Sequence, residues 1–146
     1  PCQSASPRRR PKKMAGLNRH TLQPLGGIDH AIQSVEVILS TRLRSRVMLR
    51  HFGGGVVEFL GPKRSVRLST LLKQIIGTAI DLWEPRFKVR QVRQTGTADE
   101  LALGHTKFVC ECDYRPKGHL GEFTVERVVT FGLFSTGVGG LQVVLG

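Results

Sequence analysis

Residues 65–90 read SVRLSTLLKQIIGTAIDLWEPRFKVR, a segment in which a helical pattern ends at a corner and a strand pattern begins. Ser65 is a good N-cap residue, and Pro85 ends the helix because the residue before a proline is disfavoured in the α region. The apolar residues recur at helical spacing: Leu68, Leu71, Leu72, Ile75, Ile76, Ala79, Ile80 and Trp83. This stripe is wider than one neighbour requires. It indicates either an ordinary buried helix or a helix that also packs against a partner.

A shorter helix is predicted upstream, over Ile28 to Ser40. Its apolar side chains follow helical spacing, and Asp29 places a carboxylate near the positive end of the helix dipole. The chain then becomes basic and reaches a glycine triplet at residues 53–55, which permits positive φ angles or a close backbone approach. A phosphate-binding loop is not expected there, because no strand precedes the triplet and no Lys-Ser or Lys-Thr pair follows it.

Alternating apolar and polar residues predict strands in the remaining part of the chain. Phe87 and Val89 alternate with Lys88 and Arg90. The next strand carries four residues on one face: Phe108, Cys110, Cys112 and Tyr114. Residues 123–134 are predicted to pair with it as an antiparallel hairpin, and residues 141–145 form an edge strand or a docking tail. The predicted fold class is α+β, with two amphipathic helices packed on one face of a small, mainly antiparallel sheet.

The composition is that of one globular domain with tails. The chain has 146 residues, of which 40% are hydrophobic and 23% charged. No apolar run approaches the roughly 18 residues of a membrane span, and no secretory signal is recognised, so we expect a soluble chain without a membrane partner. We divide it into an extended basic arm (1–27), a central domain (28–134) and a Gly-rich tail or edge strand (135–146).

The net charge of +11 is unevenly distributed. The arm contains no acidic residue, and its basic residues include Arg8, Arg9, Arg10, Lys12 and Lys13. An arm of this charge indicates an acidic partner, which would be an acidic protein groove or a nucleic acid, or else a solvated tail.

The cysteines predict neither a disulfide framework nor a metal site. Cys110 and Cys112 share one strand face and are expected to be buried free thiols, whereas Cys2 lies on the arm. No second pair of Cys or His residues occurs at ligand spacing, so no metal and no cofactor are expected.

Catalysis is not expected either, because no carboxylate pair suits it. A glycoside hydrolase needs two carboxyl groups in a cleft, one of them protonated. The candidates are Glu36, Glu58, Asp81 and Glu84, and of these Glu84 lies beside Arg86, whose charge favours the ionised form. The five histidines are scattered and form no nucleophilic set.

Two motifs, in this order, resemble the baseplate wedge family of contractile phage tails, which is sometimes labelled lysozyme-like. The first is Arg46-Val47-Met48 followed by Phe52-Gly53-Gly54-Gly55, and the second is Trp83-Glu84-Pro85-Arg86 at the end of the long helix. The similarity covers roughly residues 28–134. It implies a structural role in the inner ring of the baseplate, where the protein clamps wedge subunits and supports the first sheath ring.

The resemblance also implies partners and a location. The partners would be other wedge proteins and the tail sheath, with the central hub or spike as a further neighbour and about six copies per tail. The protein would be found in the virion tail baseplate after assembly in the host cytoplasm. A strand from a neighbouring subunit would extend its sheet.

The residues expected at the partner interface are Glu84, Pro85, Arg86, Arg46, Phe52 and Gly53. Pro85 fixes the corner, and Arg86 is placed to pair with a carboxylate, either within the chain or across an interface.

Three alternatives remain at this point. The first is a baseplate subunit of a type VI secretion or other contractile injection system. The second is a nucleic-acid-binding protein, which rests on charge alone because Lys88, Arg90 and Arg93 accompany no recognised binding motif. The third is a peptidoglycan hydrolase.

Overall fold

A computed structural model describes residues 15–59, 66–96, 106–136 and 140–146. The fold is α+β, as predicted, with two α-helices and antiparallel sheets. The helices and strands are β1 (Ala15–Leu17), β2 (Pro24–Gly26), α1 (Gly27–Ser40), α2 (Val66–Trp83), β3 (Phe87–Thr95), β4 (Thr106–Tyr114), β5 (Arg127–Thr136) and β6 (Gly140–Leu145). Two 3₁₀ turns, η1 (Val56–Phe59) and η2 (Gly118–Leu120), lie in the connections.

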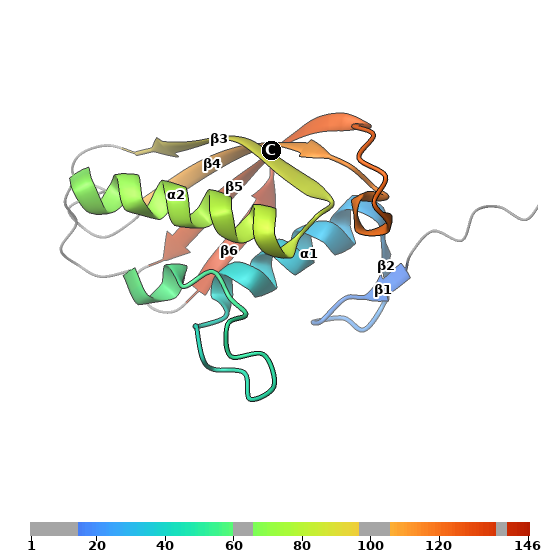
Figure 1. The fold of residues 1–146 in the computed structure, drawn as a ribbon, viewed down its shortest axis with the longest axis horizontal. Helices are drawn as coiled ribbons and strands as arrows, with labels where there is room; N and C mark the ends of the chain where they lie inside the picture. Colours follow the sequence, from blue (N-terminus) through green and yellow to red (C-terminus); the bar gives the residue numbers. More distant parts are fainter. Residues whose placement is uncertain (1–14, 60–65, 97–105, 137–139) are drawn as a thin grey trace, which may run out of the picture.

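The main sheet has four antiparallel strands in the order β3-β4-β5-β6. Its register places Cys110 opposite Phe131, and Leu133 opposite Val143, so the apolar side chains of neighbouring strands share one face. α2 packs against β3 and α1 packs against β6 on this face, and the two helices contact one another. The molecule therefore has two layers, with the core between the helices and the sheet (Figure 1).

The core confirms the alternation predicted for β4. The fully buried large side chains come from both helices and from the sheet: Phe87, Phe108, Phe131, Ile38, Leu39, Leu72, Ile76, Ile80, Leu133, Val35 and Val56. Cys110 and Cys112 are free and buried among them, as expected. Neither helix in the described ranges has the length and apolarity that a membrane crossing requires.

The broad stripe of α2 is explained mostly by contacts within the chain. This helix touches β3, α1 and η1, so its apolar surface faces three neighbours rather than one. Leu71 and Leu82 of α2 remain exposed as large apolar side chains. The ordinary buried helix is therefore the interpretation that fits most of the stripe, while Ser65 lies outside the described residues.

The strand predicted over residues 123–134 begins later in the structure, at Arg127. Phe123 and Val125 alternate as strand residues do, but both are exposed and belong to a loop. This loop contains η2, which ends at Gly121 in the left-handed conformation with φ of 84°. Residues 140–145 pair with β5 as the edge strand β6.

The second half of the predicted extended arm is a hairpin. β1 and β2 pair antiparallel because Asn18 closes the turn, with its side-chain Oδ1 accepting from the backbone N–H groups of His20 and Thr21. Gln33 of α1 holds the hairpin, since its side chain accepts from Arg19 N and donates to Leu17 O. The basic residues Arg8, Arg9, Arg10, Lys12 and Lys13, and also Cys2, lie outside the described residues.

Candidate partner interface

The Glu84-Pro85-Arg86 motif forms a tight turn between α2 and β3. The backbone carbonyl of Glu84 accepts from the N–H of Phe87 at 3.0 Å, which closes a four-residue β-turn with Pro85 at its second position. Glu84 still donates its own N–H to Ile80 O at 2.9 Å, as a helical residue does. The turn brings the side chains on either side of the proline to the same place.

Those two side chains form a buried ion pair. Arg86 Nε donates to Glu84 Oε1 at 2.6 Å, and Arg86 Nη2 donates to Glu84 Oε2 at 2.8 Å. The side chains are only 11% and 4% exposed. The hydrogen bond to Glu84 is the main reason that the pKa of Arg86 lies above its ordinary value, although burial opposes the shift. Arg86 thus pairs within the chain.

His30 completes this group from the first turn of α1. Arg86 Nη1 lies 3.0 Å from His30 Nδ1. A guanidinium can only donate, so Nδ1 is the acceptor in this contact. The ring also lies directly against β1, because a Cβ atom built on Gly16 would come within 2.4 Å of its Cδ2 and Nε2 atoms. Arg86 therefore links the α2–β3 corner to α1.

The corner is also held by the segment that follows β4. Arg115 N donates to Arg86 O at 2.7 Å. Gly118 packs against the carbonyl of Pro85 so closely that a Cβ atom there would lie 2.2 Å from that oxygen. Three segments far apart in the sequence thus meet at this turn. Pro85 remains exposed among them.

The second motif meets the first at Trp83, the last residue of α2. The Trp83 ring stacks on His51 with centroids 5.5 Å apart, and it contacts Phe52 at 4.9 Å in a tilted arrangement. The guanidinium carbon of Arg46 lies 4.0 Å from the centre of the Phe52 ring, which is a cation–π geometry. This row of side chains attaches residues 41–55, hereafter the 41–55 loop, to the corner.

The glycine triplet allows the 41–55 loop to return to the body of the protein. Gly53 has a φ of 128°, and a Cβ atom there would lie 2.6 Å from Thr41 O. Gly54 donates its N–H to Ile38 O at 2.8 Å, which satisfies a carbonyl near the end of α1. The triplet therefore serves both uses considered from the sequence, a positive φ angle and a close backbone approach.

The structure brings all six expected interface residues to one region, in two groups joined through Trp83. Glu84, Gly53 and the Arg86 side chain are largely buried, whereas Arg46 and Pro85 are exposed. No sequence pattern indicated the role of His30, which lies 56 residues from Arg86 along the chain, or the stacking of His51. Within the described ranges, no three His, Cys, Asp or Glu side chains form a group that could hold a metal ion.

The matched family model covers both halves of this region. The model described as "Baseplate wedge protein gp25" matches residues 27–116, which is more than half of the chain. The chain belongs to the baseplate wedge protein gp25 family. The match begins with α1, includes the 41–55 loop and the corner, and ends just after β4.

Individual relatives agree with membership of the gp25 family. Baseplate protein W of Escherichia phage P2 is 29% identical over 84 residues, which are 58% of this chain and 73% of that protein. A chain of the postcontracted pyocin R2 baseplate has a TM-score of 0.58 at 27% identity, covering 70% of this chain and 99% of that one.

A crystal structure described as a putative tail lysozyme from Geobacter sulfurreducens is also similar. Its TM-score is 0.54 at 21% identity, with 75% of this chain and 91% of that chain covered. At this identity the likeness concerns the fold alone.

Proposed function

We propose that this protein is a structural subunit of the baseplate wedge of a contractile phage tail, which joins neighbouring wedge proteins and supports the first sheath ring. The observation that carries the proposal is membership of the gp25 family across residues 27–116. The similarity to baseplate proteins of phage P2 and pyocin R2 supports it. We expect a ring of about six copies around the tail axis, in the virion baseplate.

The sheet offers two edges to a neighbour, and the β3 edge is protected. Asp81 Oδ1 accepts from the N–H of Val89 at 2.9 Å, and its Oδ2 pairs with Lys88 Nζ at 2.5 Å. The pairing of β3 with β4 also shifts register between Val89 and Gln91. Charged side chains and a bulge are the usual means by which edge strands avoid pairing.

The β6 edge has none of these protections. β6 contains no charged residue and no proline, and it pairs with β5 in continuous register from Leu145 to Gly140. α1 packs against β6, and β6 is the last strand of the described sheet (Figure 1). We therefore assign strand addition by a sheath or wedge neighbour to β6.

The hydrogen-bonding groups on that edge follow from the register. Gly146 donates its N–H to Thr130 O at 3.1 Å, so Gly146 and Val144 direct their backbone groups toward β5. Alternate residues of a strand face opposite ways, so the N–H groups of Leu145 and Val143 face the open edge. An incoming strand would bond to these two.

The test compares Leu145→Pro with Leu145→Ala in the full chain. Both variants remove the same side chain, but only the proline removes the outward N–H and obstructs an added strand. We expect Leu145→Ala to enter particles and Leu145→Pro to be excluded from them. Hydrogen exchange of the β4 amides in both free variants serves as the folding control.

Hydrogen exchange on the unsubstituted chain gives a second measurement. The amides of Leu145 and Val143 should exchange quickly in the free protein and slowly in the particle. Equal protection in both states, or normal incorporation of a folded Leu145→Pro chain, would show that attachment does not use this edge.

The corner has a positioning role in the proposed function. Because Glu84 and Arg86 satisfy one another and are nearly buried, they orient the surface rather than contact a partner directly. Arg46 and Pro85 are the members of the group that a neighbouring wedge protein would touch.

A further inference from the structure

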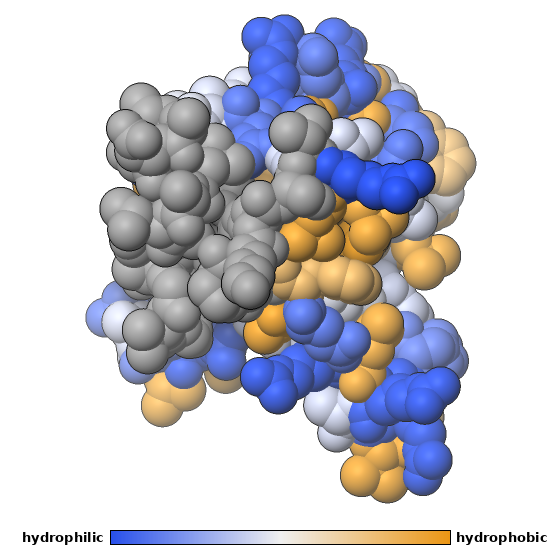
Figure 2. Space-filling view, turned by 90° about the vertical axis from the view of Figure 1, so that its left-hand side faces the viewer, coloured by the Kyte–Doolittle hydropathy of each residue, from blue (hydrophilic) through white to orange (hydrophobic). Residues whose placement is uncertain are grey.

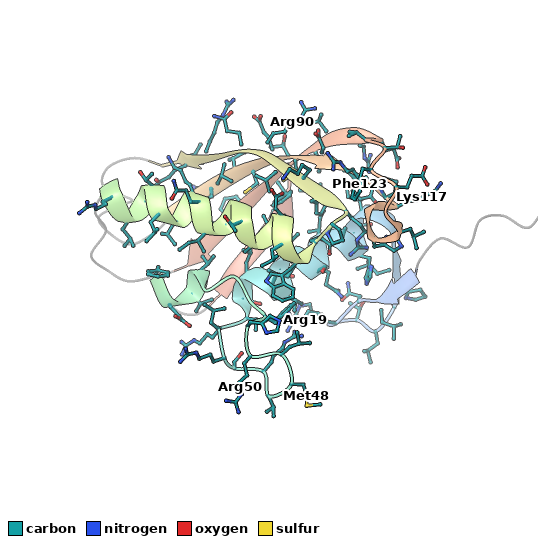
Figure 3. The ribbon with its side chains drawn as sticks, in the orientation of Figure 1. Arg19, Met48, Arg50, Arg90, Lys117 and Phe123 are labelled. Atoms are coloured by element: carbon teal, nitrogen blue, oxygen red, sulfur yellow. The ribbon has the colours of Figure 1, made fainter. Side chains whose placement is uncertain are left out.

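The 41–55 loop exposes an apolar tip. Val47 is 82% exposed and Met48 is 93% exposed. Figure 1 shows this loop extending away from the helices and the sheet. The lowest part of the surface in Figure 2 combines hydrophobic residues (orange) with hydrophilic ones (blue). In Figure 3, Met48 and Arg50 lie together at its far end. Apolar side chains at the end of a protrusion indicate a contact surface.

The loop is held in shape by hydrogen bonds between its own backbone groups. Arg44 N donates to Arg50 O at 2.8 Å, and Phe52 N donates to Leu49 O at 3.0 Å. Arg44 adopts a left-handed conformation, with φ of 65°. Together with the Arg46–Phe52–Trp83 contacts at its base, these bonds give the tip a defined position. A preorganised loop loses less conformational entropy when it binds.

The loop is strongly basic, which indicates the kind of partner it would bind. Arg42, Arg44, Arg46 and Arg50 lie on it, and residues 37–57 contain no acidic residue. Within the described part of the chain, none of these arginines is in a salt bridge with a carboxylate. The arginines around the tip are therefore complementary to an acidic surface.

A second copy of this chain fits that requirement poorly. The chain has a net charge of +11, and among the described residues five carboxylates are already in ion pairs with the chain's own lysines and arginines. Nucleic acid would satisfy the arginines but would leave Val47 and Met48 without an apolar contact. A methionine adapts to irregular apolar surfaces, which favours a protein partner.

We propose that the 41–55 loop docks into an apolar depression, bordered by carboxylates, on a different protein of the assembled baseplate. This inference rests on the proposed function, because it places the partner in the same particle. Val47 and Met48 enter the depression, and Arg42 and Arg50 meet the carboxylates at its border. The contact is separate from the β6 edge and from the buried corner.

Photo-crosslinking identifies the partner directly. Benzoylphenylalanine replaces Met48 in the full chain, particles are assembled and irradiated, and the crosslinked peptide is sequenced. The same photoreactive residue at Leu120, another exposed apolar position, reports non-specific capture. The proposal expects position 48 to give one peptide, from another baseplate protein, with Asp or Glu residues beside the crosslinked residue.

Paired variants measure the two halves of the contact. Val47→Ser with Met48→Ser removes the apolar tip, and Arg42→Gln with Arg50→Gln removes charge. Each pair should lower incorporation into particles about tenfold in competition with the unsubstituted chain. The charge variant should also lose the salt dependence of incorporation. Leu120→Ser is the matched control, and urea unfolding of each free variant checks that the fold is retained.

Several results would overturn the inference. One is a crosslink from position 48 to nucleic acid or to a second copy of this chain. Another is that position 48 gives no crosslink that the Leu120 control does not also give. The third is normal incorporation of both paired variants. If these occur in particles that contain the chain, the proposed function stands without the docking loop. If the unsubstituted chain is absent from the particles, both proposals fail.

Discussion

Among the individual residues, Arg86 is expected to have a large effect on stability. Its guanidinium is shared between Glu84 and His30, and the Glu84 carboxylate is almost without solvent. Removing one member of a buried ion pair leaves the other charge uncompensated, which is much more costly than losing a surface pair. Arg86, which was expected to pair with a carboxylate within the chain or at an interface, therefore stabilises its own chain.

We predict that Arg86→Ala lowers the free energy of unfolding by about 3 kcal/mol. Urea unfolding measures the change, and the double variant Glu84→Gln with Arg86→Ala is the control. Removing the orphaned charge should restore part of the lost stability. If Arg86→Ala unfolds at the same urea concentration as the unsubstituted chain but blocks assembly, the ion pair has its main energetic role at an interface.

We also predict opposite effects of alanine at two glycines. Gly53→Ala should destabilise the protein by about 3 kcal/mol, because its φ of 128° is strained for alanine and the new Cβ would lie 2.6 Å from Thr41 O. Gly77→Ala should stabilise it by about 0.5–1 kcal/mol, because this helical position meets only ordinary contacts at 3.8 and 3.9 Å. Thermal unfolding of the two variants is the measurement. A similar loss in both would show that the close approach at Thr41 is not the cause.

Among the elements, those with a strong period could be predicted from the sequence. α1, α2 and the buried face of β4 agree with the spacing of their apolar residues, because burial on one side imposes that spacing. The start of β5 could not be predicted, since Phe123 and Val125 alternate as strand residues do although they lie in a loop. The β1–β2 hairpin depends on Asn18 and on Gln33 of a later helix.

The candidate site was predictable only in part, for a related reason. Both motifs could be found along the chain, and Pro85 indicated the corner between α2 and β3. The contacts of Arg86 with His30 and of Trp83 with His51 join residues far apart in sequence, and no local pattern encodes such pairs.

Strand β4 leads to a prediction about alkaline pH. Burial raises the pKa of Cys110 to about 12 from an ordinary 9.0, and it raises the pKa of Cys112 as well. The unfolded chain therefore releases these protons at a lower pH than the folded chain does. The contribution of each buried thiol to the free energy of unfolding is fully present below pH 9.0. It should fall by about 1.4 kcal/mol per pH unit for each thiol as the pH rises toward 12.

Urea unfolding at pH 8 to 10.5 measures this slope. Cys110→Ala should remove one thiol's share of it, which separates the cysteines from Tyr114, whose pKa burial also raises. An unchanged slope in Cys110→Ala would mean that other groups cause the loss of stability.

For the whole molecule, two of the four candidate catalytic carboxylates lie in ion pairs within the chain. Glu84 is paired with Arg86, and Asp81 with Lys88. We predict that the isolated chain releases no soluble fragments from purified peptidoglycan, with hen egg-white lysozyme as the positive control. Cleavage that disappears in Glu84→Gln or Glu36→Gln would contradict this.

The position of β6 at the end of a meander also has a mechanical consequence. A pull along a strand attached there would load the hydrogen bonds between β6 and β5 together, in shear, and would pass the load sideways through β4 to β3. A pull across the strand would instead open the same bonds one after another, like a zipper. Attachment at this edge would therefore be strongest when the tension runs parallel to β6, and a sheath attached there would have to be oriented so that its contraction pulls in that direction.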